Sequence, residues 1–198
     1  MKFSFDVRGY LYHNGLSDIR TAYERTMEAM DKLCEEADQR KANISKLIQS
    51  GEMENHTYDD DGVSHPTALE IAEFLIEEAE STANIARSAY VLIFYHYWEK
   101  NCAHWMGKTE KYDAKKAYHY LAGDNVPFSE VELERMRKLA NFIKHDKSEC
   151  RADHPTFFQP PPRTHPGSRV IHSDDLWLTS HHMDDLFETL RTSGYPAP

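Results

Sequence analysis

The fold of this chain is decided by residues 83–105, which read ANIARSAYVLIFYHYWEKNCAHW and form the most apolar and aromatic run of the sequence. The apolar side chains recur at helical spacing and extend nearly around the cylinder, a pattern typical of a helix surrounded by other helices. The run carries Arg87, Glu99 and Lys100, whereas a bilayer span needs roughly 20 predominantly apolar residues. We therefore expect a central, buried helix.

Helical periodicity continues toward the N-terminus of this stretch. An apolar stripe that begins after Ser17 as N-cap predicts a long amphipathic helix with a stop near Gly51. After a polar loop, a second helix is expected to begin near Thr67 and to run into the central stretch or break just before it. Residues 2–7 alternate apolar and polar side chains, which predicts a short strand or ordered arm, and residues 13–15 (His-Asn-Gly) predict a turn.

Toward the C-terminus the sequence predicts three further segments of helix and one long loop. A shorter basic and aromatic helix is expected over Thr109–Leu121. The run Ser-Glu-Val-Glu at 129–132 matches a capping box, so a helix begins there and is expected to reach about His145. Residues 148–178 contain five prolines and are expected to form a long surface loop, after which Thr179 caps a last helix.

These elements predict an all-α fold, a compact bundle of five or six helices with a Pro-rich surface loop. A length of 198 residues suits one domain, 1–198, with a core that needs neither metal nor disulfide. The three cysteines, Cys34, Cys102 and Cys150, are odd in number and far apart, which indicates a reducing compartment. With neither a signal peptide nor a membrane span in the sequence, we expect a cytoplasmic protein that does not engage a membrane.

The charge is distributed unevenly. The net charge of −10 argues against indiscriminate binding of nucleic acid, and residues 51–80 hold ten acids with no Lys or Arg. Residues 100–151 reverse the sign, with eleven Lys and Arg against eight acids. Such a segment is either a solvated face or, given its interleaved aromatic residues, a surface that contacts nucleic acid.

One helix face carries the residues best suited to chemistry. Arg137, Asn141, Lys144 and His145 lie within a stripe roughly 100° wide on the helix after Ser129. A histidine exchanges protons near neutral pH and neighbouring cations neutralise a phosphate, which suits cleavage of a phosphodiester without metal. The alternative is an exposed polar face whose cations oppose the helix dipole.

The sequence resembles HEPN-type proteins, which are compact all-α domains found in toxins and antiphage systems. The resemblance rests on the runs LANFIKHDKS and RSAYVLIFYHYWEKNCAHW and on a final amphipathic helix that ends near SGYP. Such proteins commonly pair two Arg-x(4–6)-His helices across a dimer. His145 matches the histidine, and Asn141 matches the polar residue that often follows the arginine. A four-residue spacer before His145 falls on Ala140 and a six-residue spacer on Lys138, whereas Arg137 requires a seven-residue spacer.

The resemblance implies a function directed at RNA, either as a metal-independent endoribonuclease of a toxin or phage-defence system or as a relative that binds without cutting. It also implies a homodimer with the helix over 129–145 at or near the interface, and a role for Glu99 in orienting the motif. The alternative role of Glu99 is an ion pair with a Lys or Arg at the edge of the core. The alternative is a non-catalytic helical interaction module or regulator, paired with an antitoxin or a nucleotidyltransferase.

Two further clusters contain ligand-type side chains. One is His96-x-x-Glu99-x-x-Cys102, and the other is the histidine and aspartate group over residues 181–185. Neither has the ligand set of a di-iron bundle or a zinc-binding cysteine pair, and the sequence contains no phosphate-binding glycine loop or dinucleotide fingerprint. We therefore expect neither a metal nor a cofactor.

Overall fold

The structure is a computed structural model that describes residues 6–55, 62–63, 65–107, 112–146, 149–159 and 176–197. These ranges hold six α-helices and one 3-10 helix, and no β-strand occurs within them. In chain order the elements are α1 (Val7–Gln49), α2 (Ala68–Trp105), α3 (Ala114–Gly123), α4 (Glu130–His145), α5 (Glu149–Asp153), η1 (Pro155–Phe158) and α6 (Ser180–Thr192). The predicted all-α fold is confirmed.

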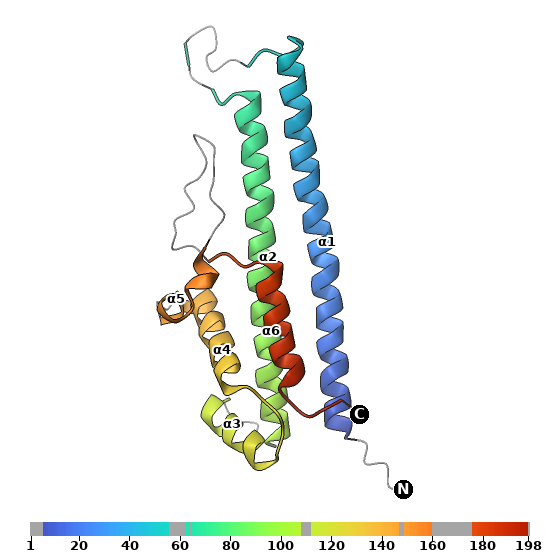
Figure 1. Cartoon of the computed structure of the whole chain (residues 1–198), viewed down its shortest axis with the longest axis vertical. Helices are drawn as coiled ribbons and strands as arrows, with labels where there is room; N and C mark the ends of the chain where they lie inside the picture. Colours follow the sequence, from blue (N-terminus) through green and yellow to red (C-terminus); the bar gives the residue numbers. More distant parts are fainter. Residues whose placement is uncertain are drawn as a thin grey trace.

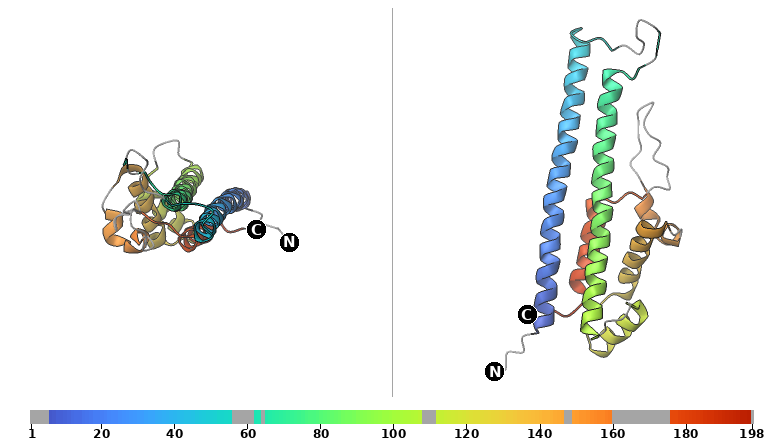
Figure 2. Two further views of the ribbon diagram at one scale, coloured as in Figure 1. Left: turned by 90° about the horizontal axis from the view of Figure 1, so that it is seen from above. Right: turned by 180° about the vertical axis from the view of Figure 1, so that it is seen from behind.

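The two long helices α1 and α2 stand side by side as an antiparallel hairpin (Figure 1). The shorter helices α3, α4, α5 and α6 gather around the half of the hairpin that holds the start of α1 and the end of α2 (Figures 1 and 2). The other half, formed by the end of α1 and the start of α2, projects as a two-helix arm. The molecule therefore has a packed end and an extended end.

Helix α1 begins ten residues before the predicted N-cap Ser17, because Asp6 caps it by accepting a hydrogen bond from the Arg8 amide at 2.8 Å. The predicted turn at residues 13–15 is therefore wrong. Gly15 instead lets α1 approach α2 closely, since a side chain there would meet Tyr97 Oη at 2.3 Å. Of the predicted strand over residues 2–7, residues 2–5 lie outside the described residues, and Val7 begins α1 instead of ending a strand.

Helix α2 is continuous for 38 residues and unites the predicted second helix with the central stretch. Thr67 caps it in a reciprocal box with Glu70, as the sequence indicated for its start near Thr67. The expectation that the central stretch is surrounded on all sides is only partly correct. Ile85 and Ile93 remain on an uncovered face of α2, because α1, α4 and α6 occupy its other sides.

The core lies at the packed end and is built on the aromatic residues of α2. Trp98 and Phe94 are fully buried, and Trp98 meets Trp105 edge to face at 6.0 Å between ring centroids. Tyr12 of α1 reaches across this core, where its hydroxyl donates a 2.7 Å hydrogen bond to the Leu190 carbonyl of α6. The buried Tyr12 hydroxyl is thus satisfied by a helix that packs on the same core.

The boundaries of α3 and α4 refine the predictions. Helix α3 begins after its N-cap Asp113 rather than at Thr109, a residue outside the described ranges. Ser129 caps α4 by accepting from the Glu132 amide at 3.4 Å, but Glu132 pairs with Arg135 instead of completing the predicted box. Helix α4 ends at His145 as predicted.

The Pro-rich segment 148–178 was predicted as a loop, and that prediction is partly wrong. It begins with the short helix α5 and the 3-10 helix η1, where Pro155 occupies the first helical position that proline tolerates. Phe157 and Phe158 are buried, and Phe158 meets Phe142 of α4 edge to face at 4.9 Å. Residues 160–175 lie outside the described residues.

The C-terminal part closes the packed end. Thr179 caps α6 in a reciprocal box with His182, and Ser193 follows its last turn as predicted. The chain then returns to the start of α1, where Arg8 donates a 2.6 Å hydrogen bond to Tyr195 Oη. In the described part of the chain, no helix has the length and apolar character required to cross a membrane.

Candidate functional site

The candidate site is a cleft of about 650 Å³ at the packed end, between α2, the start of α3 and α4. Three of the five residues named from the sequence line it, namely Glu99, Arg137 and Asn141. Its other lining residues are Tyr95, Tyr112, Asp113, Ala114, Lys115, Tyr118, Glu130 and Glu134. Residues up to 46 positions apart in the sequence, Tyr95 and Asn141, therefore meet at one surface.

Helix α4 presents Arg137 and Asn141 to this cleft because they lie beside its apolar face. Leu133, Met136 and Ala140 are fully buried in the core. Residues 137 and 141 are one turn apart and follow the edge of that buried face. Ala140, where the four-residue spacer of the HEPN-type motif would place an arginine, therefore faces the core and not the cleft.

The Arg137 guanidinium is already engaged. Its Nε and Nη2 donate to the two carboxylate oxygens of Glu134 at 2.7 and 2.5 Å, a bidentate pair between consecutive turns of α4. The hydrogen bonds lower the pKa of Glu134 and raise the pKa of Arg137, so both groups stay charged. Glu134 thereby neutralises the charge of Arg137, which the sequence analysis expected to neutralise a phosphate.

Tyrosine side chains form the inner wall of the cleft. The hydroxyls of Tyr95 and Tyr118 are shielded from water and make no hydrogen bond within the described part of the chain, although both residues are at least nine-tenths buried. Burial raises the pKa of both well above the usual value, which keeps the hydroxyls protonated. Unpartnered buried hydroxyls are uncommon, and the donor and acceptor capacity of these two stays unused behind the surface of the cleft.

The charges around the cleft are mainly negative. Its lining includes four carboxylates and two cations, namely Glu99, Asp113, Glu130, Glu134, Lys115 and Arg137. The Glu99 carboxylate accepts a hydrogen bond from His96 Nδ1 at 2.9 Å, in a pair that lies at the edge of the cleft. The site as a whole thus attracts hydrogen-bond donors more strongly than it attracts isolated anions.

The other two residues named from the sequence, Lys144 and His145, do not line the cleft. Both are exposed in the last turn of α4. Asp146 follows in the left-handed conformation, with φ at 50°, and ends the helix there. The predicted stripe is therefore divided, with Arg137 and Asn141 in the cleft and the remaining pair beyond it.

The two metal-type clusters of the sequence do not assemble. His96 is exposed whereas Cys102 is fully buried, and burial raises the pKa of the Cys102 thiol well above its ordinary range. Near the start of α6, His182 is committed to the helix cap and His181 lies 3.7 Å from Asp185. Among the residues that the structure describes, no group of three or more ligand-type side chains could hold a metal ion.

Sequence reasoning missed Glu130, Glu134 and Lys115 as members of the site. The i, i+3 spacing of Glu134 and Arg137 signals the ion pair, but only the packing of α3 against α4 brings Lys115 to the same cleft. Tyr112 and Tyr118 are among the aromatic residues interleaved in the basic segment 100–151. Their position on an acidic cleft was not predictable from their spacing.

No protein-family model matches the chain, and no curated protein or solved structure matches it.

Proposed function

We propose that this protein is an RNA-directed, HEPN-like protein that binds a single-stranded segment of RNA at the cleft. The observation that supports the proposal is that Glu99, Arg137 and Asn141, three residues named from the sequence, line one cleft together with Tyr95, Tyr112 and Tyr118. Single-stranded RNA is commonly bound through unstacked bases and 2′-hydroxyls as well as through phosphates.

The chemistry of the cleft suits bases better than phosphates. Carboxylates such as Glu99 and Glu130 accept hydrogen bonds from the exocyclic amines of bases, and the Asn141 amide both donates and accepts. Of the three tyrosines that line the cleft, Tyr112 is partly exposed, and an exposed tyrosine ring stacks on bases with little regard for sequence. Lys115 in the cleft and Lys144 beyond it offer positive charge to the RNA backbone.

One copy of the chain lacks the arrangement that cutting requires. General acid–base catalysis needs the proton-transfer group within about 3 Å of the reacting atoms, or one water away. His145 lies outside the cleft, and the Arg137 guanidinium is held by Glu134. A metal-independent endoribonuclease would therefore need a second copy that brings its His145 to this cleft, and we favour the version that binds without cutting.

The test uses fluorescence anisotropy with an end-labelled single-stranded RNA in the presence of a chelator. We expect Lys115→Glu to weaken binding at least fivefold more than Lys116→Glu, which makes the same change of charge one residue outside the cleft. Glu134→Gln should strengthen binding, because it frees Arg137 and removes one negative charge. Equal losses for the two lysine variants would contradict binding at the cleft.

The same samples run on a denaturing gel distinguish binding from cutting. Intact RNA after prolonged incubation is the expected result. Cleavage by the wild-type protein that disappears in His145→Ala would instead support the endoribonuclease version of the proposal.

A second candidate function is a non-catalytic helical interaction module or regulator. The excess of carboxylates in the cleft favours it, because a basic protein segment meets less repulsion there than an RNA backbone does. An arginine-rich synthetic peptide provides the probe. Peptide binding that Glu130→Lys abolishes, without measurable RNA binding at low salt, would favour the module.

A further inference from the structure

Three polar atoms that are shielded from water lie between α1 and α2 near the first turns of α6, helices that stand together in Figure 1. They are Nη1 of Arg20 and Oη of Tyr23 on α1, and Nε of Arg87 on α2. None of the three has a hydrogen-bond partner within the described part of the chain. Polar atoms in a protein interior are nearly always hydrogen-bonded, so three of them on neighbouring side chains indicate a missing acceptor.

Tyr23 stands at the centre of this group. It is only 4% exposed, and the Arg20 Cζ atom lies 5.6 Å from the centre of its ring. Burial raises the pKa of Tyr23, and the positive charge of nearby Arg87 opposes that rise. The hydroxyl of the adjacent Tyr90 lies 2.9 Å from Thr26 Oγ1, whereas the Tyr23 hydroxyl has no such partner among the described residues. Two guanidinium groups thus flank one buried hydroxyl.

The Arg20 guanidinium is held in place by two carboxylates. Its Nε donates to Glu24 at 2.7 Å, and its Nη2 donates to Asp184 of α6 at 2.6 Å. Because a guanidinium is planar and rigid, these two hydrogen bonds also fix the position of the third nitrogen, Nη1. Arg20 therefore offers one fixed donor, although its charge is already balanced.

Arg87 differs from Arg20 because it forms no ion pair in the part of the chain that the structure describes, although it is partly buried. A charge taken out of water without a partner is unfavourable, even where its hydrogen bonds are satisfied. A water molecule would accept a hydrogen bond from the Arg87 Nε atom, but it would leave the charge unbalanced. An anion satisfies both requirements.

The neighbouring charges favour a ligand with one negative charge. Glu24 and Asp184 already pair with Arg20, and they would repel the second charge of a phosphate monoester. A carboxylate has one charge, and its two oxygens and planar shape suit a guanidinium. A phosphodiester also has one charge, but its two ester groups are larger than the single carbon of a carboxylate, and Tyr23 is almost completely buried.

We propose that Arg20, Tyr23 and Arg87 bind the carboxylate of a small organic acid. Nε of Arg87 and Nη1 of Arg20 donate to the carboxylate oxygens, and the Tyr23 hydroxyl donates a third hydrogen bond. Arg87 precedes Glu99 by 12 residues, or about 18 Å along α2, so this site is separate from the cleft. The inference goes beyond the proposed function, and its test involves no RNA, so either can fail without the other.

Heteronuclear NMR of the isotope-labelled full chain observes the arginine Nε–H groups directly. Sodium acetate is the probe, titrated to about 100 mM while sodium chloride is reduced to hold the ionic strength constant. We expect the Nε–H signal of Arg87 to shift and to saturate, with a dissociation constant in the millimolar range, as suits so small a ligand. Loss of this signal in Arg87→Lys identifies it in the spectrum.

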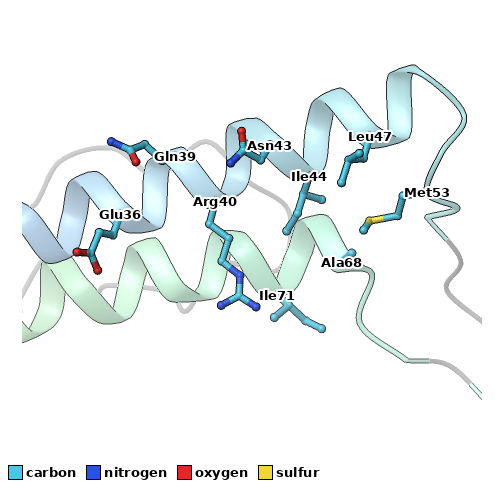
Figure 3. Close-up of a pocket in the computed structure, with 9 residues that line it drawn as sticks. All are labelled: Glu36, Gln39, Arg40, Asn43, Ile44, Leu47, Met53, Ala68 and Ile71. Atoms are coloured by element: carbon cyan, nitrogen blue, oxygen red, sulfur yellow. The ribbon is translucent and has the colours of Figure 1, made fainter.

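Arg40 provides an internal control in the same spectra. It extends from α1 toward Ile71 beside a hollow of about 510 Å³ on the projecting arm (Figure 3). Because Arg40 is exposed, water already solvates its guanidinium, and we expect its signal to stay unchanged at constant ionic strength. Saturating shifts of equal size for Arg40 and Arg87 would indicate unspecific binding of acetate to arginines and would contradict the proposal.

Variants test the individual donors. Tyr23→Phe retains the ring and removes only the hydroxyl, and it should raise the dissociation constant for acetate about threefold or more. Arg87→Gln should abolish saturable binding, as reported by the Nε–H signal of Arg20. Arg25→Gln removes the same charge from an exposed position of α1 and should change the dissociation constant by less than about twofold. Far-UV circular dichroism verifies that all three variants keep their helices.

Three results would overturn the proposal. An Arg87 signal that does not respond to acetate would mean that water satisfies the shielded donors. Equal affinity for acetate in Arg87→Gln and in the wild-type protein would place the binding elsewhere. Tighter binding of dimethyl phosphate than of acetate would assign the site to a phosphodiester and not to a carboxylate.

Discussion

We expect Asn84→Ala to lower the free energy of unfolding by about 3 kcal/mol, because Asn84 of α2 clamps the segment that leads into α6. Its Nδ2 donates to the Leu176 carbonyl and its Oδ1 accepts from the Leu178 amide, both at 2.8 Å. Leu178 is fully buried, so its amide would be left without an acceptor at a cost of about 1–3 kcal/mol. Loss of the second hydrogen bond adds about 0.5–1.5 kcal/mol.

Urea unfolding followed by circular dichroism at 222 nm measures this loss as a shift of the midpoint at constant slope. Ser88→Ala is the matched control, since the Ser88 hydroxyl bonds only to the Asn84 carbonyl at 3.0 Å, which the helix already uses. We expect this control to change stability by less than about 0.5 kcal/mol. A loss below about 1 kcal/mol for Asn84→Ala would mean that the clamp does not hold the segment.

Two further predictions concern packing and pH. Gly15→Ala should destabilise the protein by about 1–3 kcal/mol despite the higher helix propensity of alanine. The new Cβ would lie 2.3 Å from Tyr97 Oη, which is fixed by a 2.8 Å hydrogen bond to the Tyr12 carbonyl. Thermal unfolding should show a smaller loss of stability when Tyr97→Phe is added, and no loss for Gly123→Ala, where a new Cβ would meet nothing within 4 Å. Burial lowers the pKa of His182 below its ordinary 6.5, so the unfolded chain binds the proton more readily and the stability of the fold decreases as pH drops through 6.5. His182→Gln retains a side chain suited to the capping box and should reduce this pH dependence in thermal melts between pH 7.5 and 5.5. An unchanged pH dependence would exclude His182 as its source.

Local sequence signals located most helices, because their causes are local. Thr67 and Thr179 cap the helices that follow them, and Gly51 lies just beyond the end of α1. The apolar period of residues 83–105 also identified the helix that contributes more residues to the described core than any other helix. Capping and periodicity depend on neighbours within one or two turns, so a single sequence contains them.

The same local signals failed where a distant partner decides the conformation. His13, Asn14 and Gly15 resemble a turn, yet they are helical because α1 packs against Tyr97 and the core at that point. The start of the Pro-rich segment forms short helices because Phe157 and Phe158 are buried there against the core. Burial of two aromatic side chains outweighs the low helix propensity of such a segment.

The sequence by itself determined an all-α fold and the helix face that carries Arg137 and Asn141. Only the tertiary structure decided that Glu99 joins them in an acidic, tyrosine-lined cleft, that Glu134 holds the arginine, and that His145 stands apart. The physical reason is that helical spacing fixes which side chains share a face, whereas the crossing of three helices fixes which faces meet.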